Sequence, residues 1–221
     1  MKRLYKIILF LLFLSTLAKA QILTVNYERL ENNVSPNKDF SEEFKKKIIE
    51  QGKTPDKYTL YYNNGQSFFK SLPTEILQHE NAPVMVGVNT TTLVEQKTKS
   101  PTKIFKLKND DHFYFLSKNG SKSFYKKVKQ NFSSLDFKKE TQLIDKFVCK
   151  LVEVRMTNNN NVYKVWYTED LPISTGPFTY GDFPGLVLKV ESPNFVIYAT
   201  QVSDKVKLAD MESMDAKLKI E

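Results

Sequence analysis

Short runs of alternating apolar and polar residues, separated by turn-forming pairs, recur through most of this chain. In one stretch, Tyr58, Leu60 and Tyr62 alternate with other residues, and Asn64-Gly65 follows before a second run begins. Such alternation is typical of strands with one buried face, and Asn-Gly is a strong hairpin signal. Comparable runs occupy 103–128, 147–168 and 186–202. About eight to eleven short strands at hairpin spacing, without βαβ alternation, predict an antiparallel sheet.

One amphipathic segment early in the chain departs from this pattern. Asp39 followed by Glu42 resembles a capping box, in which both side chains satisfy free backbone N–H groups. Phe44 and Ile48 fall on one face of the helix that this cap would start. We therefore predict a helix over 40–51.

The composition agrees with a sheet. The chain has 16 phenylalanines and 11 tyrosines, which favour strands, and its seven glycines are too few for a glycine-rich phosphate-binding architecture. The expected fold is mostly β: a strongly bent, half-barrel-like antiparallel sheet built from hairpins, with the N-terminal helix packed on it. Residues 73–102 show no firm period, and 209–221 fit a last strand or a short helix equally well.

The first twenty residues are typical of a secretory leader. A basic start that includes Lys6 precedes an apolar run at 7–14, and Ala18-Lys19-Ala20 forms an A-x-A cleavage site. The apolar run is much shorter than the roughly 20 residues of a membrane helix. We expect cleavage after Ala20, no transmembrane span and no lipid anchor, because no cysteine follows the site. The remaining residues, 21–221, would form a single domain in the periplasm or at the cell surface.

The net charge of the chain limits the classes of partner that we expect. Loss of the leader removes four of the 33 basic residues and none of the 25 acidic ones, so the formal charge falls from +8 to +4. A mild positive charge is usual for a soluble surface and gives no reason to expect nucleic-acid binding.

Cys149 is the only cysteine, so the chain has no internal disulfide. Its neighbours alternate as in a strand, which favours a small buried hydrophobe. A metal-binding or redox-active thiol is the alternative, and no neighbouring cysteine or histidine supports it.

No arrangement of side chains in the sequence indicates catalysis. His79 and His112 are the only histidines and are far apart, and Glu75 with His79 at i, i+4 is a weak metal signal. Glu169-Asp170 offers adjacent carboxylates, which are usually solvated. We therefore predict no catalytic, cofactor or metal site and favour a binding module over an enzyme.

The segment 163–191 is the most distinctive part of the chain. It holds the only tryptophan, three of seven glycines and three of nine prolines, flanked by two strand-like runs. Proline and glycine restrict or permit particular backbone angles, so this loop has a defined shape, either structural or for recognition. Its candidate residues are Trp166, Tyr167, Pro172, Gly176, Pro177, Phe178, Gly181, Phe183, Pro184, Gly185 and Leu186.

These residues also carry a resemblance. Val165-Trp166-Tyr167-Thr168, Gly176-Pro177-Phe178 and the run 181–188 resemble the signature of the GLPGLI family, and Cys149 lies where that family has an upstream cysteine. The resemblance implies an exported protein of diderm bacteria without an established activity. It transfers no catalytic residues.

The sequence thus favours an exported, non-catalytic binding or accessory module for an unidentified ligand or envelope partner. Aromatic rings around the loop could stack on sugars or peptide side chains. Two alternatives stay open: an assembly factor that pairs through a sheet edge, or a hydrolase of undetected type.

Overall fold

The computed structural model describes residues 22–35, 38, 42–73, 84–86, 89–91, 101–157, 161–205 and 208–221. The predicted leader with its cleavage site, and the pair Glu75 and His79, lie outside the described residues. No helix within the described ranges is long and apolar enough to cross a membrane.

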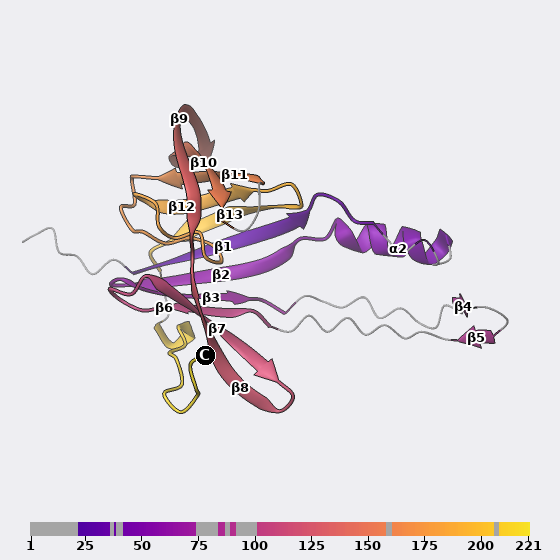
Figure 1. Ribbon diagram of the computed structural model, residues 1–221. Helices are drawn as coiled ribbons and strands as arrows, with labels where there is room; N and C mark the ends of the chain where they lie inside the picture. Colours follow the sequence, from indigo (N-terminus) through magenta and orange to yellow (C-terminus); the bar gives the residue numbers. More distant parts are fainter. Residues whose placement is uncertain are drawn as a thin grey trace, which may run out of the picture.

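Antiparallel strands make up most of the fold, as predicted from the sequence (Figure 1). The elements in chain order are β1 (Ile22–Glu31), α2 (Glu42–Gly52), β2 (Asp56–Asn63), β3 (Gln66–Ser71), β4 (Val84–Val86), β5 (Asn89–Thr91), β6 (Lys103–Lys106), β7 (His112–Asn119), β8 (Lys122–Lys129), β9 (Phe132–Ile144), β10 (Phe147–Met156), β11 (Val162–Thr168), β12 (Leu186–Glu191), β13 (Phe195–Ser203) and the 3-10 turn η2 (Leu208–Asp210).

Eleven of these strands form one sheet in the order β8-β7-β6-β3-β2-β1-β13-β12-β11-β10-β9. Two local meanders, β2 to β8 and β9 to β13, are joined through β1, which pairs with β2 on one side and β13 on the other. The short strands β4 and β5 form a separate pair within 73–102, where the sequence showed no firm period.

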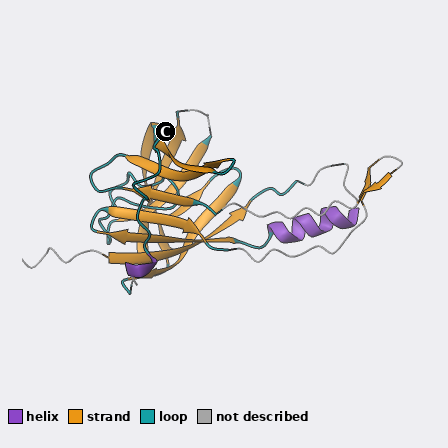
Figure 2. Ribbon diagram, turned by 90° about the horizontal axis from the view of Figure 1, so that it is seen from below, coloured by secondary structure: helices purple, strands orange, loops and turns teal. Residues whose placement is uncertain are grey.

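The sheet has to curl, because its two edge strands are neighbours in the chain. Laid flat, eleven strands would span about 48 Å at roughly 4.8 Å per spacing. Only Gln130 and Asn131 separate the end of β8 from the start of β9, and so short a link reaches about 10 Å. The end of β8 is therefore held close to the start of β9, although these strands form the two edges of the sheet. Figures 1 and 2 show the sheet bent around its interior. The predicted bent antiparallel sheet is confirmed.

Turn residues take the backbone angles that the sequence indicated. Asn64 (φ 49°) and Gly65 (φ 94°) lie in the left-handed region at the β2–β3 turn, and Gly120 (φ 59°) does so between β7 and β8. Asn109 (φ 61°) occupies the corresponding region before β7. Residues with small or hydrogen-bonding side chains tolerate these angles best, so the hairpin signals have a direct physical basis.

A hydrophobic core fills the inner face of the curled sheet. Alternate residues of the central strands are fully buried there, including Val25, Leu60, Val165, Val190 and Ile197. The loop between β11 and β12 also enters this core, so loop and sheet together exclude water from the interior.

A second core lies on the outer face of the β2–β8 half. The C-terminal segment covers this face and pairs with the free edge of β8, where Glu221 N donates to Tyr125 O (2.7 Å) and Tyr125 N donates to Lys219 O (2.8 Å). The segment is neither a full strand nor a helix but a 3-10 turn followed by one parallel bridge. The cluster comprises Tyr61, Phe68, Phe105, Tyr114 and Tyr125, with Leu116, Met211, Met214 and Leu218 packed against it.

The predicted helix is present, but its position differs from the expected one. Figures 1 and 2 show α2 beyond the ends of β1 and β2 and not over a face of the sheet. Phe44 is its one buried residue, and Lys45 and Lys47 form ion pairs within the helix. Two surfaces that could have received α2 are already occupied: the inner face by the β11–β12 loop and the outer face of the β2–β8 half by the C-terminal segment.

Candidate functional site

The loop between β11 and β12, residues 169–185, is packed inside the curled sheet. Ile173 and Phe183 are each 2% exposed, and Thr175 and Tyr180 are buried with them. The backbone ties the loop to the start of β12, since Leu186 N donates to Leu171 O (3.0 Å) and Val187 N to Thr175 O (2.9 Å). The interior of the sheet is thus occupied by the chain's own loop.

Two glycines in this loop are required by close backbone approach. A Cβ at Gly185 would lie 1.9 Å from Thr168 O, and one at Gly176 would lie 2.1 Å from Tyr180 O. Neither glycine has a positive φ. Gly181 is less constrained, because its nearest neighbour would be the Phe113 ring at 3.3 Å.

Aromatic contacts hold the loop in place. Phe178, in the left-handed region at φ 51°, lies with its ring centroid 5.0 Å from Phe69 and 5.3 Å from Tyr58. Phe183 stacks on Tyr167 at 6.2 Å. Pro177 is buried, whereas Pro172 and Pro184 are exposed.

A polar corner forms where this loop meets the β6–β7 turn. We define it by Lys106, Asp110, Asp111, His112, Lys129 and Asp182. Lys106 links the two elements, because its Nζ lies 2.8 Å from Asp182 Oδ1 and over the Phe113 ring at 4.9 Å. Lys129 pairs with Asp111 at the end of β8.

Asp110 is the best-connected carboxylate of the polar corner. It accepts hydrogen bonds from Tyr114 Oη (2.6 Å) and from the backbone N–H of His112 (2.9 Å). The Tyr114 hydrogen bond is the main reason that the pKa of Asp110 falls from 3.8 to about 2, and the same bond raises the pKa of Tyr114 to about 12. A hydrogen bond from Lys129 lowers the pKa of Asp111.

His112 Nδ1 faces two carboxylates, at 2.8 Å from Asp110 Oδ1 and 2.7 Å from Asp111 Oδ1. A carboxylate that holds one ring nitrogen fixes the orientation of the imidazole and directs the other nitrogen outward. Ligand atoms of Asp110, Asp111 and His112 lie within 4.8 Å of one another, so these residues could also contact a metal ion. This grouping was not predicted from the sequence. Its only signal in the sequence is the run Asp110-Asp111-His112.

Trp166 lies apart from the loop, on the outer face of the sheet. Val165 beside it is fully buried on the inner face, and alternation along β11 directs Trp166 the other way. The indole Nε1 donates to Glu191 Oε1 (3.0 Å), which also pairs with Lys189 (2.7 Å). Burial opposes ionisation of Glu191, but the hydrogen bonds from Lys189 and Trp166 outweigh it and lower its pKa.

The remaining candidate groups are structural or solvent-facing. Cys149 is fully buried, and burial raises the pKa of its thiol to about 12. Glu169 is exposed and pairs with Lys150 at 2.6 Å. Asp170 is exposed beside it, and its backbone N–H bonds Thr168.

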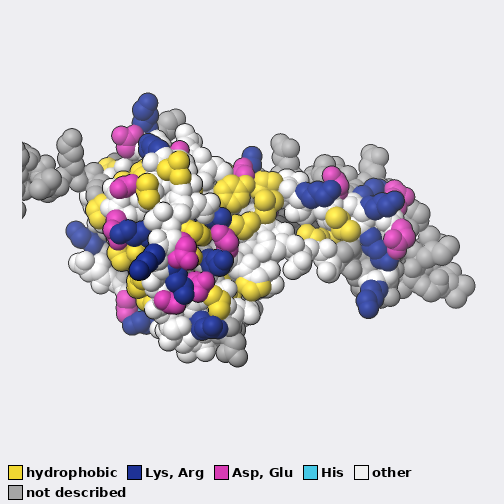
Figure 3. All heavy atoms as spheres, turned by 90° about the horizontal axis from the view of Figure 1, so that it is seen from above, with side chains coloured by type: hydrophobic (Ala, Val, Ile, Leu, Met, Phe, Trp, Pro, Cys, Tyr) yellow, Lys and Arg dark blue, Asp and Glu magenta, His cyan; other side chains and the backbone are white. Residues whose placement is uncertain are grey.

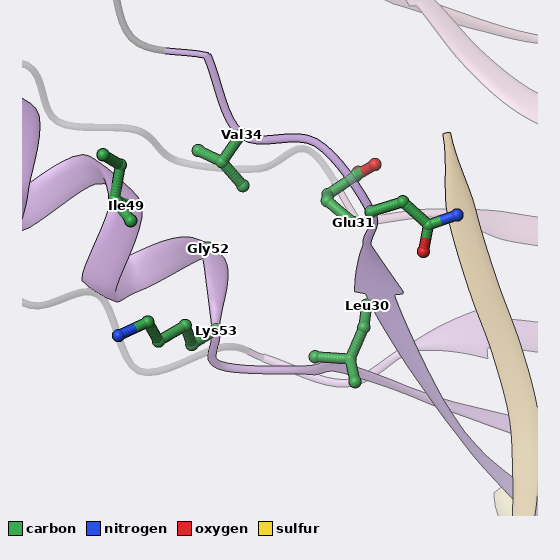
Figure 4. A pocket seen from close by; sticks show the side chains of 7 residues that line it. Leu30, Glu31, Val34, Ile49, Gly52 and Lys53 are labelled. Atoms are coloured by element: carbon green, nitrogen blue, oxygen red, sulfur yellow. The ribbon is translucent and has the colours of Figure 1, made fainter. Parts of the chain in front are cut away.

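An open pocket of about 390 Å³ lies between α2 and the end of β1 (Figure 4). In Figure 4, Leu30, Val34 and Ile49 border this space, with Glu31 and Lys53 beside them. Its lining contains one acid, one lysine and no histidine or cysteine, so it offers no arrangement for acid–base chemistry.

Comparison with known families identifies the chain. Residues 57–220 match the family model described as "N-glycanase peptide, N-terminal domain". The chain belongs to this family. The GLPGLI assignment based on 163–191 is therefore wrong: the match extends from β2 to the C-terminal segment, whereas the shared Trp, Pro and Gly positions serve local packing.

Solved structures agree with the N-glycanase N-terminal domain family in fold. Two structures of PNGF-II, in the C2 and P21 space groups, superpose with TM-scores of 0.54 and 0.52 at 17% and 19% sequence identity. They cover 91% and 90% of this chain, which spans 30% of the PNGF-II chain in each case. A comparison with curated protein sequences finds no match. The polar corner, the loop and Trp166 all fall within the part that matches the N-glycanase family model.

Proposed function

We propose that this chain is the N-terminal domain of an N-glycanase-type hydrolase, which hydrolyses N-linked glycans. Within that reaction, the role of this domain is to bind the glycan part of the substrate. The family match over 57–220 carries this proposal. It supports the hydrolase alternative of the sequence analysis better than an envelope module with an unspecified ligand.

Packing of the interior favours binding at the surface over catalysis inside the sheet. The buried loop 169–185 occupies the place where a half-barrel could hold a substrate. Within the sheet, the groups available to a ligand are therefore on the outer face and at the polar corner. A binding role also fits the PNGF-II comparison, because this chain corresponds to less than a third of that protein.

One observation favours a second candidate, in which the domain itself assists hydrolysis. The carboxylates of Asp110 and Asp111 hold His112 Nδ1, and an imidazole oriented in this way can take a proton from water through Nε2. Lys129 could stabilise negative charge nearby, since it already contacts Asp111. Binding without turnover and this acid–base role make different predictions.

A single peptide carrying one Asn-linked glycan separates the two. We would incubate it with the full chain, measure affinity by calorimetry and follow conversion of the linked Asn to Asp by mass spectrometry, with the same peptide lacking the glycan as control. Glycan-dependent binding without conversion is the expected result. If the linked Asn is converted and His112→Gln abolishes the conversion, the second candidate is established instead. If the chain neither binds nor converts the glycopeptide, both candidates are refuted.

We also propose that the domain is exported, from the leader-like residues 1–20. The protein isolated from its own cell envelope should begin at Gln21. An N-terminus at Met1 in that fraction would contradict cleavage.

A further inference from the structure

The outer face of β11–β13 and β1 carries a row of facing side chains. Trp166 is paired directly with Lys189, Lys189 with Tyr198, and Tyr198 with Glu28. Directly opposed residues of antiparallel strands share a face, so these side chains stand next to one another across four strands. We call Trp166, Lys189, Tyr198 and Glu28 the outer row.

The outer row differs from the rest of the outer face in what covers it. Over β2–β8, the C-terminal segment packs on the aromatic cluster and buries Tyr61 and Tyr125. Trp166 and Tyr198 are both partly exposed, and the Lys189 side chain retains 21% of its accessible surface. Two aromatic rings are thus presented to solvent on a rigid sheet.

Polar contacts fix these rings in advance. Glu191 binds both the Trp166 indole N–H (3.0 Å) and Lys189 Nζ (2.7 Å), and Tyr198 Oη donates to Glu28 Oε2 (3.1 Å). A side chain already held in one rotamer loses little entropy when a ligand binds. The outer row is therefore preorganised.

Its chemistry suits an uncharged polar ligand with flat apolar faces. Lys189 is neutralised by Glu191, and the molecule seen from above in Figure 3 has both signs of charge interspersed over the sheet. Aromatic faces offer stacking surfaces, while the carboxylates and Lys189 offer acceptors and donors at the same level. Sugar rings have both kinds of group, with C–H faces for stacking and hydroxyls for hydrogen bonds.

We propose that the outer row binds a short uncharged oligosaccharide, with one ring on Trp166, a second over Lys189 and a third beside Tyr198. The Trp166 and Tyr198 side chains are two strand spacings apart, roughly 10 Å, which suits two sugar rings that have one further ring between them. The inference rests on the proposed function, because it assigns the glycan-binding step to a particular surface.

Intrinsic tryptophan fluorescence reports on this site, because Trp166 is the only tryptophan in the chain. Titration of the full chain with N,N′-diacetylchitobiose should give a saturable change in intrinsic emission. In calorimetry with the glycopeptide, Trp166→Ala and Tyr198→Ala should each weaken binding roughly tenfold, about 1.4 kcal/mol. Phe137→Ala removes an aromatic ring that is 53% exposed but outside the row, and should leave affinity unchanged.

Thermal unfolding of each variant shows whether it is folded. If Trp166→Ala does not fold, Tyr198→Ala still tests the site. The outer-row assignment would be overturned if all three variants bind the glycopeptide with wild-type affinity and Trp166 emission does not change on titration. That result would leave the proposed function intact. Equal binding of the glycan-free peptide, lost in the row variants, would mean a peptide site and would also overturn it. No glycan binding by the wild-type chain would refute the proposed function itself.

Discussion

The hydroxyl of Tyr27 donates a hydrogen bond of 2.6 Å to the backbone oxygen of Val187. Tyr27 is on β1 and Val187 on β12, with β13 between them in the sheet, so the bond crosses the inner face. The accepting oxygen lies in the backbone where the β11–β12 loop ends and β12 begins. Val187 N is bonded to Thr175 O in that loop.

Tyr27→Phe should therefore lower the free energy of unfolding by about 1–3 kcal/mol, because it leaves a buried carbonyl without this donor. Tyr198→Phe removes a hydroxyl bond at a partly exposed site and should cost less than about 0.5 kcal/mol. Urea unfolding of the two variants gives the comparison. Equal losses would contradict a special role for the buried bond.

Gly185→Ala should destabilise the protein by more than about 3 kcal/mol or prevent folding, since the added Cβ would meet backbone 1.9 Å away. Gly181→Ala is the matched control in the same loop, where the nearest atom is a phenylalanine ring at 3.3 Å. Its expected loss is under about 1 kcal/mol. Thermal midpoints measure both, and a tolerated Gly185→Ala would disprove the tight approach to Thr168.

The ion pair between Lys106 and Asp182 should contribute more than an ordinary surface pair. The Lys106 side chain is only 12% exposed, so Asp182→Asn leaves a largely desolvated ammonium without its partner. We expect a loss of about 1 kcal/mol. Glu50→Gln breaks the exposed pair with Lys53 and should change stability by less than about 0.5 kcal/mol. Chemical denaturation that ranks the two variants in the opposite order would refute this.

Asp110 should make stability sensitive to acid in a defined range. Its pKa is lowered from 3.8 to about 2 in the folded chain, so its contribution is complete above pH 3.8 and is lost as the pH falls toward 2. Asp110→Asn should flatten the stability profile in that window, measured as urea midpoints from pH 6 to pH 2. Tyr114→Phe should weaken the same dependence, because the tyrosine hydrogen bond is the largest cause of the shift. An unchanged acid limb in both variants would contradict this assignment.

Local signals in the sequence were sufficient for much of the fold. Asn64-Gly65 and Asn119-Gly120 form turns with the backbone angles that those residues tolerate, and the alternation around Val165 matches its burial. The helix predicted over 40–51 overlaps α2 (Glu42–Gly52), whereas its proposed cap Asp39 lies outside the described residues.

Features that depend on distant pairing could not be predicted in this way. The outer row exists because the registers of two strand pairs align Trp166, Lys189 and Tyr198, and one of those pairs contains a bulge next to Trp166. The polar corner needs Asp182 to approach Lys106 across 76 residues.

The place of β1 at the centre of the sheet has a consequence for the order of assembly. The strands from β2 to β8 and from β9 to β13 pair mostly with their neighbours in sequence, and such local contacts form quickly. The earliest strand of the sheet must wait for Val202 and its neighbours, near the end of the chain, before it can pair on both sides. Joining the two halves through β1 is thus the slow, non-local step. A chain released before β13 is made would hold two partly folded meanders with no strand to unite them.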